Sequence, residues 1–374
     1  MLRFLTSGES HGKCLIAILE GMVAGLGVNE ADINGDLARR QEGYGRGGRM
    51  AIEKDEVEIL SGVRSGVSIG GPIALYIPNK DFKINELPVV KRPRPGHADL
   101  VGAMKYGRAD VRDILERASA RETVSRVAVG AVCRKFLLEF GVDIMSHVVR
   151  MGNVACGTTG MSFDQIKKNA AASQMHCADP EITRLMMQRV DEARASKDTI
   201  AGEFEVLVKG VPAGLGSFVH YDRRLTSKIG AAVLSIQAVK GVEFGLGFKT
   251  AQKLGREVHD EIFHDAKRGF YRKTNNAGGF EGGVTNGELL VIRAATKPYS
   301  TLMSPLQSVN IDTKAKESAT VERSDVTAVP ACGVIAEAMT AFELASAYLE
   351  KFGGDSLNET KRNFDGYLNQ IKEF

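Results

Sequence analysis

VRDILERASARETVSRVAVGAVCRKFLLEF, residues 111–140, carries the clearest helical pattern in the chain. Its apolar residues recur at spacings of three and four, and Gly141 follows as a stop signal. Four arginines lie on its polar side, at positions 112, 117, 121 and 126. A second long apolar helix is predicted over residues 334–352, closed by Gly353 and Gly354.

Strand patterns surround these two helices. Short runs rich in β-branched and apolar residues, with Gly and Ser between them, predict strands within 57–77, 204–211 and 289–295. Cap signals predict shorter helices over 30–41 after Asn29, after Ser162 and over 180–195, and a further helix is expected over 227–239.

The segments VEILSGVRSGVSIGG (57–71) and FEVLVKGVPAGLGSF (204–218) resemble each other, although chance explains the similarity about as well. If the repeat is real, the chain has two pseudo-symmetric halves. No Pro/Ser linker or charge run divides the sequence. We therefore predict a single α+β domain over residues 1–374, with grouped helices and sheets packed on them.

The composition is that of an ordinary globular protein. The 374 residues include 49 basic and 46 acidic side chains, a formal charge of +3, which argues against a protein that coats nucleic acid. The five cysteines are far apart, so neither a zinc cage nor a disulfide framework is predicted. No stretch approaches the ~18 apolar residues of a membrane span, and we expect a cytoplasmic protein.

Residues 43–48, GYGRGG, match the dinucleotide fingerprint G-x-G-x-x-G in letters only. That fingerprint needs an apolar strand before it and a helix after it, whereas both flanks here are charged. A dinucleotide fold is therefore not expected. The segment instead places arginines beside glycines, which either bind a carboxylate or phosphate or form a solvated loop. These arginines are Arg39, Arg40, Arg46 and Arg49.

Two histidines lie in glycine-flanked polar turns, His11 in GESHG and His97 in RPRPGHADL. His97 has basic neighbours and Asp99 two residues later, a setting in which a histidine can exchange protons near neutral pH. Glu9 and Ser10 are candidate partners that could orient His11. The other five histidines lack comparable surroundings.

Three further segments could contribute to a site. NNAGGFEGGVTNG (275–287) offers backbone with few side chains, which suits a flat ring or a phosphate, or equally a pair of β-turns. KPYST (297–301) adds a cation and hydroxyls, and ERSD (322–325) adds Arg323 and Asp325. Each segment alone is also compatible with an ordinary loop.

Taken in order, eight motifs resemble the chorismate synthase family over almost the entire chain. They are GESHG, RRQEGYGRGGRM, RPGHAD, the RASARET segment, QAVKGVEFG, NNAGGFEGG, KPYST and ERSDVTAVPACGVIAEAM. The resemblance implies a lyase that eliminates phosphate, in the 1,4-anti sense, from 5-enolpyruvylshikimate 3-phosphate to give chorismate. This is the last step of the shikimate pathway to the aromatic amino acids.

The resemblance also implies reduced FMN as cofactor, although substrate and product differ by no net redox change. Because the chain lacks the extra length of forms that carry their own reductase, we expect an external NAD(P)H-dependent flavin reductase. By analogy with the family, His97 protonates or hydrogen-bonds the departing phosphate. His11 interacts with the reduced flavin ring, and Asp325 helps the flavin nitrogen accept the ring proton of the substrate.

The remaining site residues are also carried over from the family. The predicted substrate contacts are Ser10, Arg40, Arg46, Arg49, Arg121 and Arg323. The predicted FMN contacts are Arg117, Ala118, Ser119, Gln237, Ala238, Gly282, Lys297, Pro298, Tyr299, Ser300, Thr301 and Arg323. No metal is expected.

The family fold is a β-α-β sandwich, in which the two long helices would form a layer between antiparallel sheets. The resemblance also implies a homotetramer without nucleic-acid or membrane partners. One alternative is a flavin oxidoreductase that uses the same FMN site for hydride transfer. Another is an RNA-binding protein that uses the basic region 91–126, although the few aromatic residues there disfavour base stacking.

Overall fold

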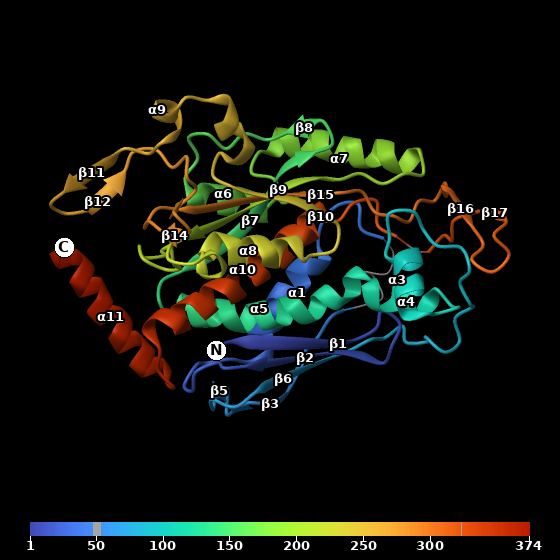
Figure 1. Cartoon of the computed structure of the whole chain (residues 1–374), viewed down its shortest axis with the longest axis horizontal. Coiled ribbons are helices and arrows are strands. Elements are labelled where there is room, and N and C mark those ends of the chain that lie inside the picture. Colours follow the sequence, from blue (N-terminus) through green and yellow to red (C-terminus); the bar gives the residue numbers. More distant parts are fainter. Residues whose placement is uncertain (48–53, 323) are drawn as a thin grey trace.

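The structure is a computed structural model of the 374-residue chain, and it describes residues 1–47, 54–322 and 324–374. Two antiparallel sheets enclose a layer of helices (Figure 1). The first sheet has the strand order β1-β2-β6-β3, and the second has the order β10-β15-β9-β7-β8. The α+β sandwich expected for this chain is confirmed.

Each sheet turns one apolar face toward the helices. Along β6, for example, Ile73, Leu75 and Ile77 are fully buried while the residues between them are not, which is the period of two that a half-covered strand requires. The first sheet consists of β1 Arg3–Gly8, β2 Cys14–Glu20, β3 Glu58–Ser61 and β6 Ile73–Pro78. The second consists of β7 Asp143–Met151, β8 Val154–Ala155, β9 Gly202–Lys209, β10 Val239–Phe244 and β15 Leu290–Thr296.

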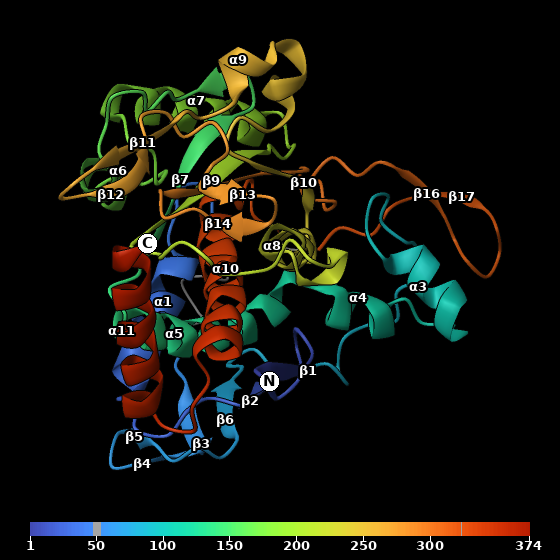
Figure 2. The same ribbon diagram turned by 60° about the vertical axis from the view of Figure 1, so that its left-hand side comes forward.

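The helical layer is built around α5 and α10, which lie side by side between the sheets (Figure 2). Their close approach depends on Gly130 of α5, because a Cβ placed there would lie 2.3 Å from the Cβ of Ala338 in α10. The layer consists of α1 Glu30–Gln41, α5 Thr123–Leu138, α8 Leu225–Leu234 and α10 Val329–Phe352.

The single helix predicted over residues 111–140 is wrong, because it is interrupted at Ser119. Helix α4 covers Arg112–Ala118, a 3-10 turn η1 covers Ala120–Glu122, and only then does α5 begin. Ser119 has an extended backbone, with φ −63° and ψ 143°, and its side chain accepts a hydrogen bond from the backbone N–H of Arg121. A serine that caps the next turn in this way competes with helix continuation.

Most other predicted elements are present, and the helices predicted over 30–41 and 180–195 have the predicted bounds. Asn29 caps α1, Ser162 caps α6 (Phe163–Ala171) and Asp179 caps α7 (Pro180–Ala195). Two predictions were partly wrong. The helix expected over 227–239 ends at Leu234, and the helix expected from 334 begins five residues earlier, at Val329.

The similarity between segments 57–71 and 204–218 does not correspond to equivalent strands. The first segment contains β3, an edge strand, and the short strands β4 Val63–Arg64 and β5 Val67–Ser68. The second begins with β9, which is central in its sheet and pairs with both β7 and β15.

Helix α10 is long and apolar enough to cross a membrane by length and composition, but 89% of its most apolar 18-residue stretch is buried inside the protein. It is therefore explained as the core helix of the sandwich. No other helix in the described part of the chain passes the same test.

The remaining elements lie outside the two sheets and the helical layer. Helices α6 and α7 cover the outer face of the second sheet (Figure 1). The others are α3 Asp99–Tyr106, η2 Tyr221–Arg223, η3 Gly247–Gln252, α9 Gly255–Val258, β11 Ile262–Asp265, β12 Gly269–Arg272, β13 Phe280–Glu281, β14 Val284–Thr285, β16 Gln307–Val309, β17 Lys316–Ser318 and α11 Leu357–Glu373.

Candidate active site

One cavity of about 680 Å³ brings together most of the predicted site residues. It lies where the β1–β2 turn, the end of α1 and the break between α4 and α5 meet the start of α10 and two loops, 94–98 and 297–301. A volume of this size is typical of small-molecule sites. His11, His97 and Asp325, which are remote in sequence, all line it.

His11 lies in the β1–β2 turn, and Glu116 of α4 holds its ring. Nδ1 of His11 lies 2.9 Å from Oε2 of Glu116, and the backbone N–H of His11 donates to the same oxygen at 2.9 Å. Arg112, one turn earlier on α4, donates to Oε1 at 3.1 Å. Burial raises the pKa of Glu116, but the contacts with His11 and Arg112 outweigh it and leave that pKa below its ordinary value. The orienting partner is thus Glu116, not the expected Glu9 or Ser10.

His97 is also held by a buried carboxylate. Its Nδ1 lies 2.5 Å from Oδ1 of Asp99. Arg94 donates to the same carboxylate from its backbone N–H, Nε and Nη2, at 3.0, 2.9 and 3.1 Å. Burial raises the pKa of Asp99, and the bonds from His97 and Arg94 lower it by more, so the carboxyl is ionised at neutral pH. Arg94 also donates to Oγ1 of Thr301 at 2.9 Å, which ties this loop to the KPYST segment.

Arg40 and Arg121 share the buried counter-ion Asp55. Nη1 of Arg121 donates to Oδ1 of Asp55 at 2.5 Å, and Nη1 of Arg40 lies 3.6 Å from Oδ2. Arg40 also donates to the backbone oxygen of Ala120 at 3.1 Å. Burial lowers the pKa of Arg40 to about 10; Asp55 opposes this shift, while Arg46 and Arg121 add to it. Positive charge is therefore concentrated on this wall of the cavity, which favours an anionic ligand.

Arg46 and Asp325, which both line the cavity, form an ion pair in which Nη1 of Arg46 lies 2.8 Å from Oδ2 of Asp325. The backbone N–H of Gly47 donates to Oδ1 of Asp325 at 2.6 Å. Because only 10% of the Arg46 side chain is exposed, Arg46 does not belong to a solvated loop. Tyr299 also lines the cavity, and burial followed by the charge of Asp325 raises the pKa of its phenol.

Most of the predicted cofactor residues line the same cavity. Nζ of Lys297 donates to Oγ of Ser300 at 2.8 Å, and burial lowers the pKa of Lys297. Gln237 donates to Glu122 at 3.3 Å, while its Oε1 is buried without a hydrogen-bond partner among the described residues. The predicted cofactor residues that line the cavity are Ala118, Ser119, Gln237, Ala238, Lys297, Tyr299, Ser300 and Thr301. The substrate candidates there are Ser10, Arg40, Arg46 and Arg121.

Three of the predicted residues that the structure describes do not line the cavity, namely Arg117, Gly282 and Pro298. Arg117 points toward β1 and donates to two of its backbone oxygens, at 3.0 and 3.1 Å. Gly282 lies in the turn between β13 and β14, and Pro298 is exposed. Arg49 and Arg323 lie outside the described residues.

Sequence reasoning missed the carboxylates that hold the cationic groups of the site. Glu116 follows Arg112 at the i,i+4 spacing of a helical ion pair, so this contact could have been found. Asp99 was noted only as a neighbour of a histidine. Only the fold brings Asp55 into contact with Arg121, and no local sequence pattern indicates that ion pair.

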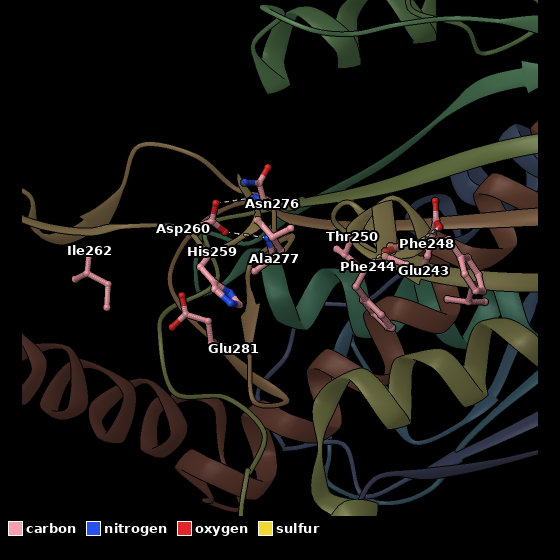
Figure 3. A pocket seen from close by; sticks show the side chains of 14 residues that line it. Glu243, Phe244, Phe248, Thr250, His259, Asp260, Ile262, Asn276, Ala277 and Glu281 are labelled. Carbon is pink, nitrogen blue, oxygen red and sulfur yellow. Dashed lines mark hydrogen bonds between the residues drawn. The ribbon is translucent and has the colours of Figure 1, made fainter. Parts of the chain in front are cut away.

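A second cavity, of about 660 Å³, lies between β10, η3 and α9 (Figure 3). Its three carboxylates already have hydrogen-bond donors: Glu243 and Asp260 accept from backbone N–H groups, and Glu281 accepts from the side chains of Arg272 and Asn286. Glu243 accepts from Phe248 at 3.0 Å, and Asp260 accepts from Asn276 and Ala277 at 2.8 and 2.9 Å. The described residues that line it include none of the predicted catalytic residues, so the first cavity is the candidate active site.

Comparisons with known proteins agree over the whole chain. A family model described as chorismate synthase matches residues 2–349. The curated relatives named chorismate synthase include one from Geobacter metallireducens that is 54% identical and one from Geobacter sulfurreducens that is 53% identical. Each of these alignments covers 100% of both chains. A solved structure, "Crystal Structure of Chorismate Synthase", has a TM-score of 0.84 and 44% identity, and covers 100% of this chain and 99% of that chain.

Proposed function

Because the chain belongs to the chorismate synthase family, we propose that the cavity of His11, His97 and Asp325 is where it carries out the reaction of that family. The reaction is the 1,4-anti elimination of phosphate from 5-enolpyruvylshikimate 3-phosphate, which gives chorismate in the shikimate pathway. The observation that carries this assignment is the convergence of two histidines, one carboxylate and several arginines on one cavity of about 680 Å³.

The arginines match the charge of the substrate, which carries two carboxylates and a phosphate. Arg40 and Arg121 lie on one wall with Asp55 as counter-ion, and Arg46 lies beside Asp325. Planar guanidinium groups bind carboxylate and phosphate oxygens through paired N–H donors. Nη1 of Arg40 is buried and makes no hydrogen bond within the described part of the chain, so it can donate to such an oxygen. Ser10, Arg49 and Arg323 complete the proposed set.

Anti elimination needs an acid and a base on opposite faces of the ring, and the cavity offers candidates for both. We assign His97 to protonate or hydrogen-bond the departing phosphate, because it lies among Arg94, Asp99 and the loop 297–301. Asp325 assists removal of the ring proton. His11 presents a ring nitrogen to the cofactor. Holding these groups in place around the substrate lowers the entropic part of the barrier.

The residues around the cavity fit a flavin mononucleotide. The cation and hydroxyls of Lys297, Ser300 and Thr301 suit a phosphate, while the buried Oε1 of Gln237 can accept from a ring N–H. Reduced FMN would supply transient electron donation that helps phosphate leave, without net redox change. The residues proposed to hold it are Arg117, Ala118, Ser119, Gln237, Ala238, Gly282, Lys297, Pro298, Tyr299, Ser300, Thr301 and Arg323.

Further proposals concern the setting of the enzyme. We propose a cytoplasmic homotetramer of single-domain chains that depends on a separate NAD(P)H-dependent flavin reductase and binds neither nucleic acid nor membrane. Gly282 does not line the cavity of its own chain, so its proposed flavin contact would come from a neighbouring copy. A tetramer provides such copies.

An anaerobic assay tests the proposed function. Purified protein, the enolpyruvyl substrate and chemically reduced FMN should yield chorismate and phosphate in equal amounts. Omitting FMN should abolish both products. Phosphate release without chorismate would indicate a simple phosphatase and would contradict the proposal.

A further inference from the structure

Helix α4 holds the β1–β2 turn that carries His11. The backbone oxygen of Glu116 accepts from the backbone N–H of Ser10 at 3.0 Å, and its carboxylate accepts from the backbone N–H of His11 at 2.9 Å. The next residue, Arg117, donates to backbone oxygens of β1. The position of the histidine is thus set by the end of one short helix.

The same carboxylate determines which ring nitrogen of His11 carries a proton. An ionised carboxylate can only accept hydrogen bonds, and Glu116 is fully buried against Arg112. Nδ1 of His11, 2.9 Å from Glu116, must therefore be the donor. Nε2 lies on the opposite side of the ring, and 14% of the His11 side chain is exposed in the cavity.

Histidine–carboxylate contacts elsewhere in the chain show that the contact alone does not indicate function. His147 meets Glu205 at 3.1 Å through Nε2, and Arg293 holds the other side of this carboxylate. That histidine side chain has no exposed surface, so it presents nothing to a ligand. The pair of His220 and Asp222 is largely exposed. The pair of His11 differs because its carboxylate is buried and its ring reaches the cavity.

We propose that Glu116 is a positioning residue that keeps Nδ1 of His11 protonated and presents Nε2 to the reacting ligands. This inference rests on the proposed function, because it concerns what His11 offers inside that cavity. Arg112 donates to Glu116 at 3.1 Å, which favours the ionised carboxylate, and it also donates to Glu322 at 3.1 Å. The hydrogen bonds that position His11 are therefore connected, through Arg112, to the ERSD segment that carries Asp325.

The tautomer can be measured without any assay of activity. In the full-length protein labelled with ¹⁵N-histidine, NMR shifts of the ring nitrogens identify the protonated one, and His11→Ala assigns the signal. We expect wild-type His11 to have a protonated Nδ1, with Nε2 as the nitrogen that loses its proton. Glu116→Gln should give a mixture, because an amide can donate as well as accept. An unprotonated Nδ1 of His11 in the wild type would overturn the proposal, whether or not the protein makes chorismate.

Kinetics supply the second readout. Glu116→Gln should lower kcat at least about 10-fold with the KM for substrate changed less than about twofold, because a carboxylate that fixes the tautomer of an active-site histidine affects turnover strongly when it is replaced by an amide. Glu205→Gln is the matched control, because it changes the same residue type in a buried histidine–carboxylate–arginine contact away from the cavity. Its kcat should stay at the wild-type value.

The outcomes separate the inference from the function on which it rests. A normal kcat in Glu116→Gln, an equal loss in both variants, or a loss with the His11 tautomer unchanged would each overturn the positioning role. A wild-type protein that forms no chorismate with reduced FMN would instead overturn the proposed function.

Discussion

His97 lines the cavity and is held by Asp99, which Arg94 holds in turn, and the proposed function assigns it to the departing phosphate. We predict that His97→Ala lowers turnover about 100-fold or more, the usual scale for losing a positioned acid. FMN affinity, measured by flavin titration, should be nearly intact. The matched control is His220→Ala, which removes a largely exposed histidine from another carboxylate pair and should leave turnover unchanged. Wild-type turnover in His97→Ala would reject the assignment.

Substitutions of Arg46 separate the effect of its positive charge from the effect of its planar guanidinium group. Arg46→Lys keeps a cation beside Asp325 but removes the planar fork, so we expect the substrate KM to rise about 10-fold, or roughly 1.4 kcal/mol. Arg46→Ala should also destabilise the fold by about 3 kcal/mol, because it removes the cation that neutralises the largely buried carboxylate of Asp325. Steady-state kinetics and urea unfolding measure the two effects. An unchanged KM in Arg46→Lys, with lost stability, would assign Arg46 a structural role.

Glu337 determines a predicted pH dependence of stability. It accepts from Nη2 of Arg39 at 2.7 Å and from Oγ of Ser146 at 2.6 Å, and it also pairs with Arg134. Burial raises its pKa, but the two arginines and the hydrogen bonds lower it by more, so that it falls from the ordinary 4.5 to about 2. A carboxyl group whose pKa is lower in the folded state stabilises the fold at pH values above its unfolded-state pKa. This contribution is lost as the pH falls from 4.5 toward 2.

The corresponding test compares Glu337→Gln with the wild type by urea unfolding between pH 7 and pH 3. The variant should lack about 3 kcal/mol of stability at pH 7, and the difference should shrink as pH falls through this window. A difference that stayed constant with pH would show that the ionised form of Glu337 does not supply the stabilisation.

At the scale of elements, the contact between α5 and α10 depends on a glycine. A Cβ at Gly130 would lie 2.3 Å from the Cβ and 2.4 Å from the Cα of Ala338, so the helices would have to separate. We predict that Gly130→Ala destabilises the fold by about 1–3 kcal/mol. Gly366→Ala in α11 meets nothing within 4 Å and should instead stabilise by about 0.5–1 kcal/mol, the ordinary helix preference for alanine. Thermal unfolding of both variants checks the sign of each effect, and a stabilising Gly130→Ala would contradict the packing described.

The elements themselves were largely predictable because caps and apolar periodicity are local signals. Asn29, Ser162 and Asp179 cap the helices that the sequence predicts. The break at Ser119 was not predictable from periodicity, because apolar spacing continues on both sides of it. The sequence also does not show why the chain turns there, since Glu116 and Arg117 before the break are fixed by β1 and its turn.

At the scale of the whole molecule, residues carrying reactive or charged groups were easier to predict than the residues that hold them. His11, His97 and Asp325 belong to recognisable motifs, and the fold brings them to one cavity. Glu116 and Asp55 lie outside the eight family motifs, and their roles depend on contacts between residues 105 and 66 positions apart in the sequence. Such contacts follow from sheet and helix packing, which single-sequence patterns do not specify.

Asp325 should affect the rate of the reaction without changing its stoichiometry. If this carboxylate only assists proton removal, Asp325→Ala slows chorismate formation while each flavin still supports many turnovers. Rapid-quench measurement of chorismate, with the flavin spectrum followed in parallel, would show this. A variant that consumed flavin in step with product would contradict the role.

The central claim, that this cavity performs an elimination and not a redox reaction, is tested most directly by the number of chorismate molecules formed per flavin. The measurement uses photoreduced FMN in limiting amount, under anaerobic conditions and without NADPH. An elimination returns the flavin in its reduced state, so we predict many equivalents of chorismate while the flavin stays reduced. Product that stops at one equivalent, with the flavin oxidised in step, would contradict the claim and favour a flavin oxidoreductase.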